Sequence, residues 1–307
     1  MNRSSRLRRF FCVAAILFSV KSLLSAQTHV AEPVVNLGDT TFLDGAGAPG
    51  FLAEQIVDGA YDGRIAGSNG VTVPDAGSLA SISGLTHVAW ISQKRIAGAW
   101  YGAEVLVSEA YVNADTQGRQ GGFGDLTVGP FILQWPQRHL LGMPIDQRID
   151  ADFELPVGYY SREPGVNLGS NTFRIHPYYA ITAHPAKRVE TSWRVHYLWN
   201  SENAAPPLSS GAQSTQAGQA IHFNVTAAYN VHKALWIGVN GYFFSQVTDG
   251  RINGVVLPNS PERVGAIGPG MVWAGRHWLF YANEYEEIGA RNRATGQKLV
   301  LRVEKIF

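Results

Sequence analysis

The sequence predicts a transmembrane antiparallel up-and-down β-barrel of about twelve strands, exported to the outer membrane of a Gram-negative cell. Three observations support this fold class. The chain begins with a secretion signal, continues as a series of alternating segments of membrane-strand length, and connects these segments by loops that are alternately short and long.

The first 26 residues have the layout of a cleaved signal peptide. A basic stretch (1–9) precedes an apolar core of eleven residues (10–20), and the small pair Ser25-Ala26 follows. The core is too short to span a bilayer. The only cysteine, Cys12, lies within this signal. We therefore divide the chain into a signal peptide (1–26), an N-terminal segment that could plug the lumen (27–50) and a barrel (51–307).

Charge and hydropathy exclude two classes of protein. Residues 27–307 carry 20 Lys and Arg against 24 Asp and Glu, a net charge of −4, so no nucleic-acid partner is expected. No later stretch is apolar over the length of a transmembrane helix, which excludes a helical membrane protein. Barrel strands escape this test because their apolar residues alternate with polar ones.

The strands are predicted from two-residue alternation. Residues 189–200 are typical: Trp193, Val195 and Tyr197 alternate with Arg194 and His196. The predicted strands are 51–60, 84–93, 97–108, 123–135, 147–158, 171–182, 188–200, 219–230, 234–246, 263–273, 277–287 and 297–307.

A soluble β-sandwich would show the same alternation, so the connections decide between the two folds. Short connections are expected at 93–96, 183–188, 230–233 and 274–276. Long polar ones are expected at 113–122, 158–170, 201–218, 248–262 and 289–296. Outer-membrane barrels alternate in this way because periplasmic turns are tight and extracellular loops are long.

Aromatic residues at the predicted periplasmic rim agree with a bilayer environment. Five of the eight tryptophans lie near predicted short turns, where interfacial rings are common; they are Trp90, Trp135, Trp236, Trp273 and Trp278. The last strand ends at Phe307 and resembles the signal by which the barrel-assembly machinery recognises its clients, although Lys305 departs from the usual apolar residue. The expected partners are this machinery and the outer-membrane lipid bilayer.

Polar rows on the inward face are the candidate substrate path. Asp150, Asp152 and Glu154 share one strand face, and adjacent strands offer acidic and basic partners on the matching face. The row could be an ion-pair ladder, a selectivity element or, least favoured, a metal site; a calcium loop would need a curled backbone with a central glycine. The candidate lumen residues are Asp150, Asp152, Glu154, Arg174, His176, Tyr178, Glu190, Arg194, His196, His222, Asn224, Trp236, Tyr242, Phe244 and Glu284.

Aromatic residues share the inward phase of several predicted strands and suit an apolar ligand with a polar handle. They are Trp100, Trp236, Tyr242, Phe244, Trp278 and Phe280.

Three stretches resemble the meta-pathway phenol-degradation family of outer-membrane barrels. They are Gly38–Gly45 (GDTTFLDG) followed by Ala48-Pro49-Gly50, Gly124–Trp135 (GDLTVGPFILQW), and the tail with Tyr285-Glu286, Arg291-Asn292-Arg293, Gly296 and Phe307. The resemblance covers most of the chain after the signal. It implies a barrel that takes up hydrophobic or aromatic small molecules, and it carries over no catalytic residues.

Other functions are less well supported. Gly45–Gly50 fits G-x-G-x-x-G but lacks the strand and helix that a dinucleotide site needs, so a tight turn is expected there. No histidine has serine two residues later, as a barrel phospholipase would require, and no nucleophile elbow or zinc pair occurs. We expect a passive channel for small hydrophobic or aromatic solutes, without cofactor, metal or catalytic residues. A structural or adhesive barrel acting through its loops is the alternative, and a lipid hydrolase is less favoured.

Overall fold

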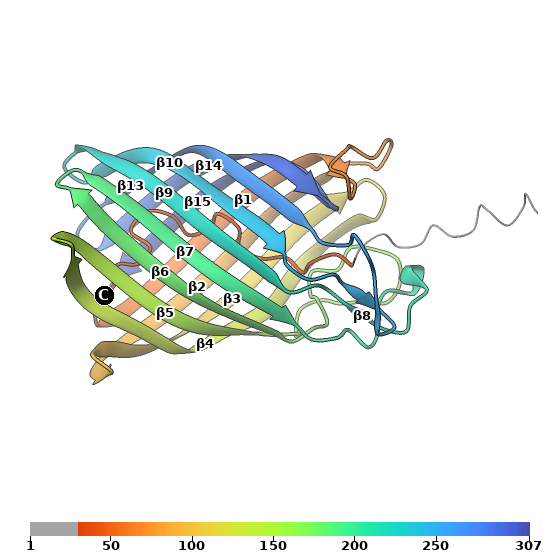
Figure 1. Ribbon diagram of the computed structural model, residues 1–307, viewed down its shortest axis with the longest axis horizontal. Helices are drawn as coiled ribbons and strands as arrows, with labels where there is room; N and C mark the ends of the chain where they lie inside the picture. Colours follow the sequence, from red (N-terminus) through yellow and green to blue (C-terminus); the bar gives the residue numbers. More distant parts are fainter. Residues whose placement is uncertain (1–29) are drawn as a thin grey trace, which may run out of the picture.

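The computed structural model describes residues 30–307, and the predicted signal peptide lies outside them. Twelve strands form a closed barrel (Figure 1). They are β1 (Gly50–Ala66), β2 (Leu79–Ile96), β3 (Ala99–Ala114), β4 (Gly118–Leu140), β5 (Met143–Leu155), β6 (Arg174–Ala186), β7 (Val189–Asn200), β9 (Ala220–His232), β10 (Leu235–Gln246), β13 (Arg263–Ala274), β14 (Trp278–Arg291) and β15 (Arg293–Ile306).

Each strand of the barrel pairs antiparallel with its neighbours in the sequence, and the first and last strands close the cylinder. Leu52 of β1 lies opposite Ile306 of β15, while Phe51 lies opposite Trp90 of β2. Closure leaves no free sheet edge, which a structure surrounded by lipid requires because its backbone groups have no water to bind. The predicted fold class, with its twelve strands, is confirmed.

The two ends of the barrel differ as predicted. Residues 97–98, 187–188, 233–234 and 275–277 form tight turns at the end where β1 begins and β15 finishes. Ala97 and Gly98 both have positive φ, as the two central residues of a type I′ hairpin turn require. By the rule for outer-membrane barrels, this end faces the periplasm and the opposite end faces the cell exterior.

Two predicted long loops are wrong. Strand β3 continues to Ala114 and β4 starts at Gly118, and only Asn292 separates β14 from β15. Residues 113–122 and 289–296 look like loops because they are polar and glycine-rich. They continue the backbone ladder beyond the membrane, where a strand needs no apolar face. For the same reason β4 and β5 extend to a two-residue turn, Leu141-Gly142, that the sequence did not predict.

The remaining long connections fold over the extracellular end. Residues 201–219 and 247–262 contribute β8 (Thr215–Gln216), β11 (Arg251–Ile252) and β12 (Val255–Val256), which form a small sheet (Figure 1). A single 3-10 turn, Leu208–Ser210, precedes this sheet. Within residues 30–307, no helix has the length and apolar character needed to cross a membrane.

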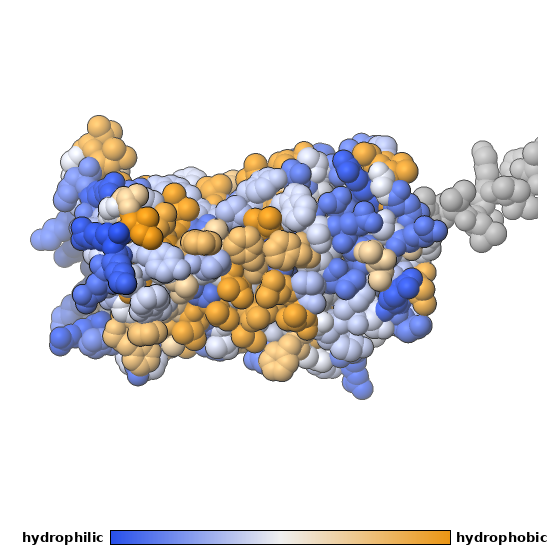
Figure 2. Space-filling model, turned by 90° about the horizontal axis from the view of Figure 1, so that it is seen from below, coloured by the Kyte–Doolittle hydropathy of each residue, from blue (hydrophilic) through white to orange (hydrophobic). Residues whose placement is uncertain are grey.

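The outer wall carries an apolar belt between two polar ends (Figure 2). In the middle of the strands, the outward side chains are large and apolar, including Val195, Val239 and Ile267. Near the periplasmic turns, aromatic rings pack against one another on the outside: Phe51 with Trp90, and Trp278 with Phe280. This distribution matches a bilayer core with an aromatic girdle, and the protein is an outer-membrane barrel.

A charge placed in this belt is expected to destabilise the barrel according to its depth. Val195 lies midway along β7 and faces outward, whereas Val231 faces outward near a periplasmic turn. We expect Val195→Arg to reduce the free energy of unfolding in lipid by about 2–4 kcal/mol, and Val231→Arg to reduce it by about 0–1 kcal/mol. Reversible urea unfolding in liposomes measures both, and equal effects would contradict the assigned membrane position.

Candidate functional site in the barrel lumen

A segment of the chain occupies the barrel interior. Residues 30–49, here called the lumen segment, precede β1 and run inside the strands from the loop end to the periplasmic end (Figure 1). They contain turns and bends but no strand or helix. Apart from two turns of its own, closed by Leu37 and Ala46, the lumen segment forms hydrogen bonds with side chains of the wall, and these contacts occur along its whole length.

At the extracellular end, a carboxylate of the lumen segment meets two amides of the wall. The side-chain amides of Asn200 and Gln246 donate to Glu32, each at 2.6 Å. The backbone N–H of Glu32 donates to the carboxylate of Glu262 at 2.7 Å. Slightly deeper, Arg174 donates to the carbonyl of Val34 at 3.0 Å. These contacts fix the outer part of the lumen segment between β6, β7 and β10.

In the middle of the barrel, the chain passes close to aromatic and polar side chains. Gly38 donates its N–H to Asn224 at 3.0 Å and accepts from the Tyr285 hydroxyl at 2.7 Å. Asp39 forms an ion pair with Lys298 at 2.7 Å. Gly38 has positive φ, and a Cβ there would lie 2.7 Å from the Tyr285 ring, so only glycine fits.

Nearer the periplasm, Asp44 is held by two arginines. The Nε of Arg194 donates to Asp44 at 2.7 Å, a second Arg194 nitrogen contacts the other carboxylate oxygen, and Arg148 lies 4.0 Å away. Such a two-point pair orients the carboxylate as well as binding it. Phe42 is fully buried against Val272 and Tyr281.

The G-x-G-x-x-G stretch is a turn packed against the wall. The N–H of Ala46 donates to the carbonyl of Leu43 at 3.0 Å. Gly45 donates to Thr182 and accepts from Gln134, and a Cβ on Gly45 would lie 2.5 Å from the backbone nitrogen of Thr182. This glycine therefore allows the lumen segment to touch the backbone of β6.

The inner wall carries an apolar cluster and a polar region. On β1, β7, β10 and β13–β15, buried apolar residues pack with Leu37 of the lumen segment; among them are Ile56, Leu198, Tyr242, Phe244, Val264, Tyr285 and Val300. On β5, β6, β7 and β9, the inward side chains are mostly charged or polar. In this region Arg174 is ion-paired with Glu154, and the Tyr178 hydroxyl donates to Asp150 at 3.2 Å.

Most of the predicted lumen residues are brought together by this arrangement. Buried on the inner wall are Asp150, Asp152, Glu154, Arg174, His176, Tyr178, Glu190, Arg194, His196, His222, Asn224, Tyr242 and Phe244. Trp236 is half-buried and packs near Phe42. In β5 and β6, acidic and basic positions lie in register: Asp152 faces His176 and Glu154 faces Arg174.

Glu284 is a correction, because it faces outward. The inward set of β14 is Leu279, Tyr281, Asn283, Tyr285 and Glu287. Trp278 and Phe280, also expected inside, are exposed on the outer wall. Both faces of this strand carry aromatic and acidic residues, so its alternation does not distinguish them, and the predicted phase was reversed.

Comparison with known proteins agrees with the barrel. Residues 63–303 match the family model described as "Putative MetA-pathway of phenol degradation". The chain belongs to this family. Among solved structures, an outer membrane channel from Pseudomonas putida F1 has 16% sequence identity and a TM-score of 0.75, over 85% of this chain and 97% of that one.

A second solved structure, the β domain of the Bordetella autotransporter BrkA, has 9% identity and a TM-score of 0.48, over 85% of this chain and all of that domain. No curated protein sequence matches this chain. Family membership and the similarity to the Pseudomonas channel thus agree on an outer-membrane barrel.

Sequence reasoning missed the charged residues on the opposite wall in this family member. Arg302 pairs with Glu54 at 2.6 Å, and His87 bridges Glu54 and Glu104 at 3.2 and 3.0 Å. These residues lie on β1, β2, β3 and β15. Strands β2 and β3 each place one ionisable side chain inward, whereas β1 and β15 place several, among them Asp58 and Lys298. Glu54 and Arg302 come from the first and the last strand, so only closure of the barrel brings them together.

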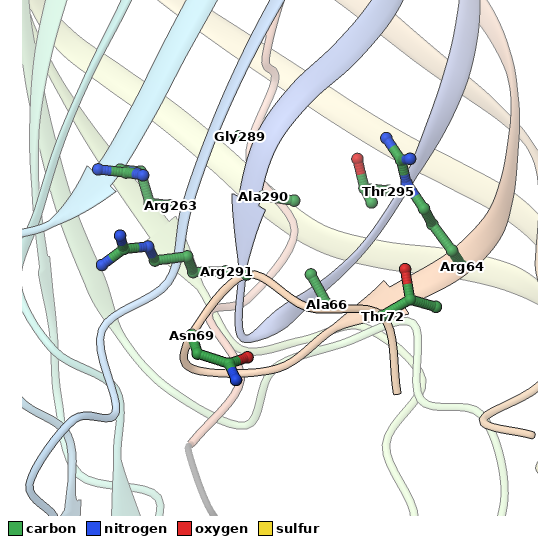
Figure 3. A pocket seen from close by; sticks show the side chains of 10 residues that line it. Arg64, Ala66, Asn69, Thr72, Arg263, Gly289, Ala290, Arg291 and Thr295 are labelled. Carbon is green, nitrogen blue, oxygen red and sulfur yellow. The ribbon is translucent and has the colours of Figure 1, made fainter. Parts of the chain in front are cut away.

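A recess opens among the loops at the extracellular end (Figure 3). It encloses about 280 Å³ between β1, β14 and β15, and three arginines border it, namely Arg64, Arg263 and Arg291. Its lining is too polar for an apolar solute, and it lies apart from the histidine and carboxylate rows of the lumen.

The outer end of the lumen segment is expected to loosen as the pH rises. Burial raises the pKa of Glu32 to about 8, against the lowering effect of Gln246 and Asn200, and burial raises the pKa of Glu262 to about 7. Because docking raises the pKa of Glu32, the protonated carboxyl favours the docked state. This contribution is complete when the pH is below the ordinary pKa of 4.5, and it is lost as the pH rises through about 8.

A spin label on Val34→Cys, whose side chain is exposed, reports this change. We expect label mobility to increase between pH 6 and pH 9, and the increase to be much smaller in Glu32→Gln, which cannot ionise. If the label mobility in the protein that retains Glu32 did not change with pH, the raised pKa of Glu32 would be contradicted.

Proposed function

We propose that the protein is a channel for passive, diffusional uptake of small hydrophobic or aromatic compounds across the outer membrane. The observation that carries this proposal is the apolar and aromatic cluster on the inner wall, formed by residues such as Phe244, Val264 and Tyr285 and packed against Leu37 of the lumen segment. The interior of a water-filled porin is polar instead.

An aromatic solute has two needs that this lumen can meet. Its ring requires apolar contacts, which Phe244 and Tyr242 on β10 offer, and a hydroxyl substituent requires a hydrogen-bond partner, which Asn224 or His222 on neighbouring β9 offers. Moderate binding at several such positions lets the solute leave as readily as it binds, so the concentration gradient is sufficient to drive transport.

The lumen segment acts in this proposal as a displaceable plug. It carries no strand or helix of its own, and it is held by separate hydrogen bonds and ion pairs to wall side chains and by apolar packing of Leu37 and Phe42. Such a segment can leave without breaking the backbone ladder of the barrel. The substrate path then comprises the fourteen inward candidates named above, without Glu284, and we assign no catalytic role to them.

Assembly is part of the same proposal. Phe307 is exposed beside the periplasmic end, and its N–H donates to the carbonyl of Phe51 at 2.9 Å. The terminal aromatic ring is thus accessible once the last strand has formed, and we propose that it is recognised by the barrel-assembly machinery.

Initial uptake rates in cells test the transport proposal. Gram-negative cells that produce the protein are given labelled phenol or toluene at low concentration, and a labelled disaccharide serves as the polar comparison. We expect faster aromatic uptake with the protein than without it, a several-fold reduction in Phe244→Asn, and no reduction in Phe243→Leu, which changes the neighbouring outward ring. Equal uptake with and without the protein would favour a structural or adhesive barrel.

A further inference from the structure

Three histidines from three adjacent strands meet in the lumen. His176 on β6, His196 on β7 and His222 on β9 are all buried, and each offers a ring nitrogen within 4.8 Å of the other two. His196 and His222 lie opposite each other in the strand register, and their rings stack at 4.2 Å. The Nε2 atoms of His176 and His222 are 2.7 Å apart.

This cluster is not satisfied by hydrogen bonding. Neither ring nitrogen of His196 has a partner, and Nδ1 of His222 also lacks one, although these atoms are inaccessible to solvent. An unpartnered buried imidazole nitrogen is costly unless something else binds it. Two histidines could be a hydrogen-bonded pair, but the third, with both nitrogens free, points to a missing ligand.

The surroundings of His176 resemble the support of a metal ligand. Nδ1 of His176 lies 3.1 Å from Glu154, so the neutral ring can donate there and keep Nε2 as an acceptor facing the other histidines. Arg174 in turn forms an ion pair with Glu154 and fixes that carboxylate. A carboxylate behind an imidazole selects the tautomer that a metal requires.

We propose that His176, His196 and His222 form a binding site for a divalent transition-metal ion of the zinc class. Three imidazoles are a ligand set that suits Zn²⁺, Cu²⁺ or Ni²⁺, with one further position left open. Metal–nitrogen distances of about 2.0–2.1 Å separate the nitrogens of a tetrahedral site by roughly 3.4 Å. The His176–His222 pair, at 2.7 Å, must therefore open by roughly 0.7 Å, and the other nitrogens, which lie within 4.8 Å of one another, must approach by up to roughly 1.4 Å.

The ion would join β6, β7 and β9 in the extracellular half of the lumen. It would also add positive charge close to Asp152, which faces His176 in register and has an unpartnered carboxylate oxygen. Each of the three strands contributes one histidine to the cluster, so the sequence shows no zinc motif, and only the strand register brings the three together.

The experiment uses the tag-free mature protein, refolded in detergent with or without Co²⁺ or Zn²⁺ because the site is enclosed. After desalting, metal content is measured by elemental analysis, and Co²⁺ coordination by its visible absorption bands. We expect about one ion per chain, intense bands typical of four-coordinate cobalt, and resistance to thermal unfolding that increases with metal. His184→Ala is the matched control, since His184 lies on β6 but outside the cluster.

In His196→Ala and His222→Ala, we expect at least tenfold weaker metal binding and no metal-dependent gain in thermal stability. His196→Gln, which keeps much of the side-chain volume, separates ligand loss from a packing defect, and heat-modifiable gel mobility verifies that each barrel is folded. The proposal is overturned if the folded barrel takes up no metal. It is also overturned if the cluster variants bind as much metal as His184→Ala.

Discussion

Deletion of residues 30–47 is expected to raise the single-channel ion conductance of the barrel on the order of tenfold, because a twelve-stranded cylinder encloses more space than its wall side chains fill. The deleted residues include Phe42 and Asp44, which are buried in the lumen, and exclude the Pro49-Gly50 junction with β1. Planar-bilayer recordings of the refolded protein measure the change.

A synthetic peptide of residues 30–47 is the matched control for this deletion. Added in excess, it should lower the conductance again, because the wall groups that bind Glu32, Asp39 and Asp44 are still present. A deletion variant that closes into a barrel but conducts no more than the full chain would show that the lumen segment does not block the pore.

Asp44→Ala is expected to release the inner part of the lumen segment. The substitution leaves Arg194 buried without its carboxylate, and breaking a buried pair in this way costs about 3–5 kcal/mol. Backbone amides between Gly38 and Gly45 should then exchange their hydrogens roughly 10²- to 10⁴-fold faster, because this cost lowers the free energy of local opening. Hydrogen exchange with mass spectrometry measures the rates.

A double-mutant comparison shows whether the ion pair is responsible. Arg194→Met removes the guanidinium and retains a long side chain, so Asp44→Ala combined with Arg194→Met should exchange more slowly than Asp44→Ala alone. Asp75→Ala is the control: Asp75 is exposed in the β1–β2 loop, away from Arg194, and its removal should leave the exchange of amides 38–45 unchanged. Rapid exchange already present in the unsubstituted protein would contradict the docked state.

The fold was predictable because its signals are local. Two-residue alternation locates strands, and tight turns such as Ala97-Gly98 and Lys233-Ala234 lie where apolar runs are closely spaced. Strand ends beyond the membrane were less predictable, because the ladder through Asn113 and its partner Arg119 continues by backbone pairing alone. The phase of β14 failed for a related reason, since Glu284 and Glu287 place acids on both faces.

The candidate site was predictable only in its parts. Single strands indicated that His176, His196, His222 and Arg194 face inward, but sequence spacing holds no information on which inward groups meet across the lumen. Asp44 pairs with Arg194 across 150 positions of sequence. Such contacts depend on barrel closure and on the path of the lumen segment, neither of which alternation encodes.

Solute flux through the purified barrel tests the central claim most directly. The refolded mature protein is placed in liposomes without any energy source, and the entry rates of phenol, toluene and a monosaccharide are compared with those of empty vesicles. Passive aromatic uptake predicts protein-dependent entry of the two aromatic compounds down their gradients, a smaller effect for the sugar, and a lower aromatic rate in Phe244→Asn. A folded barrel that accelerates neither class of solute, or the sugar alone, would contradict the proposed function.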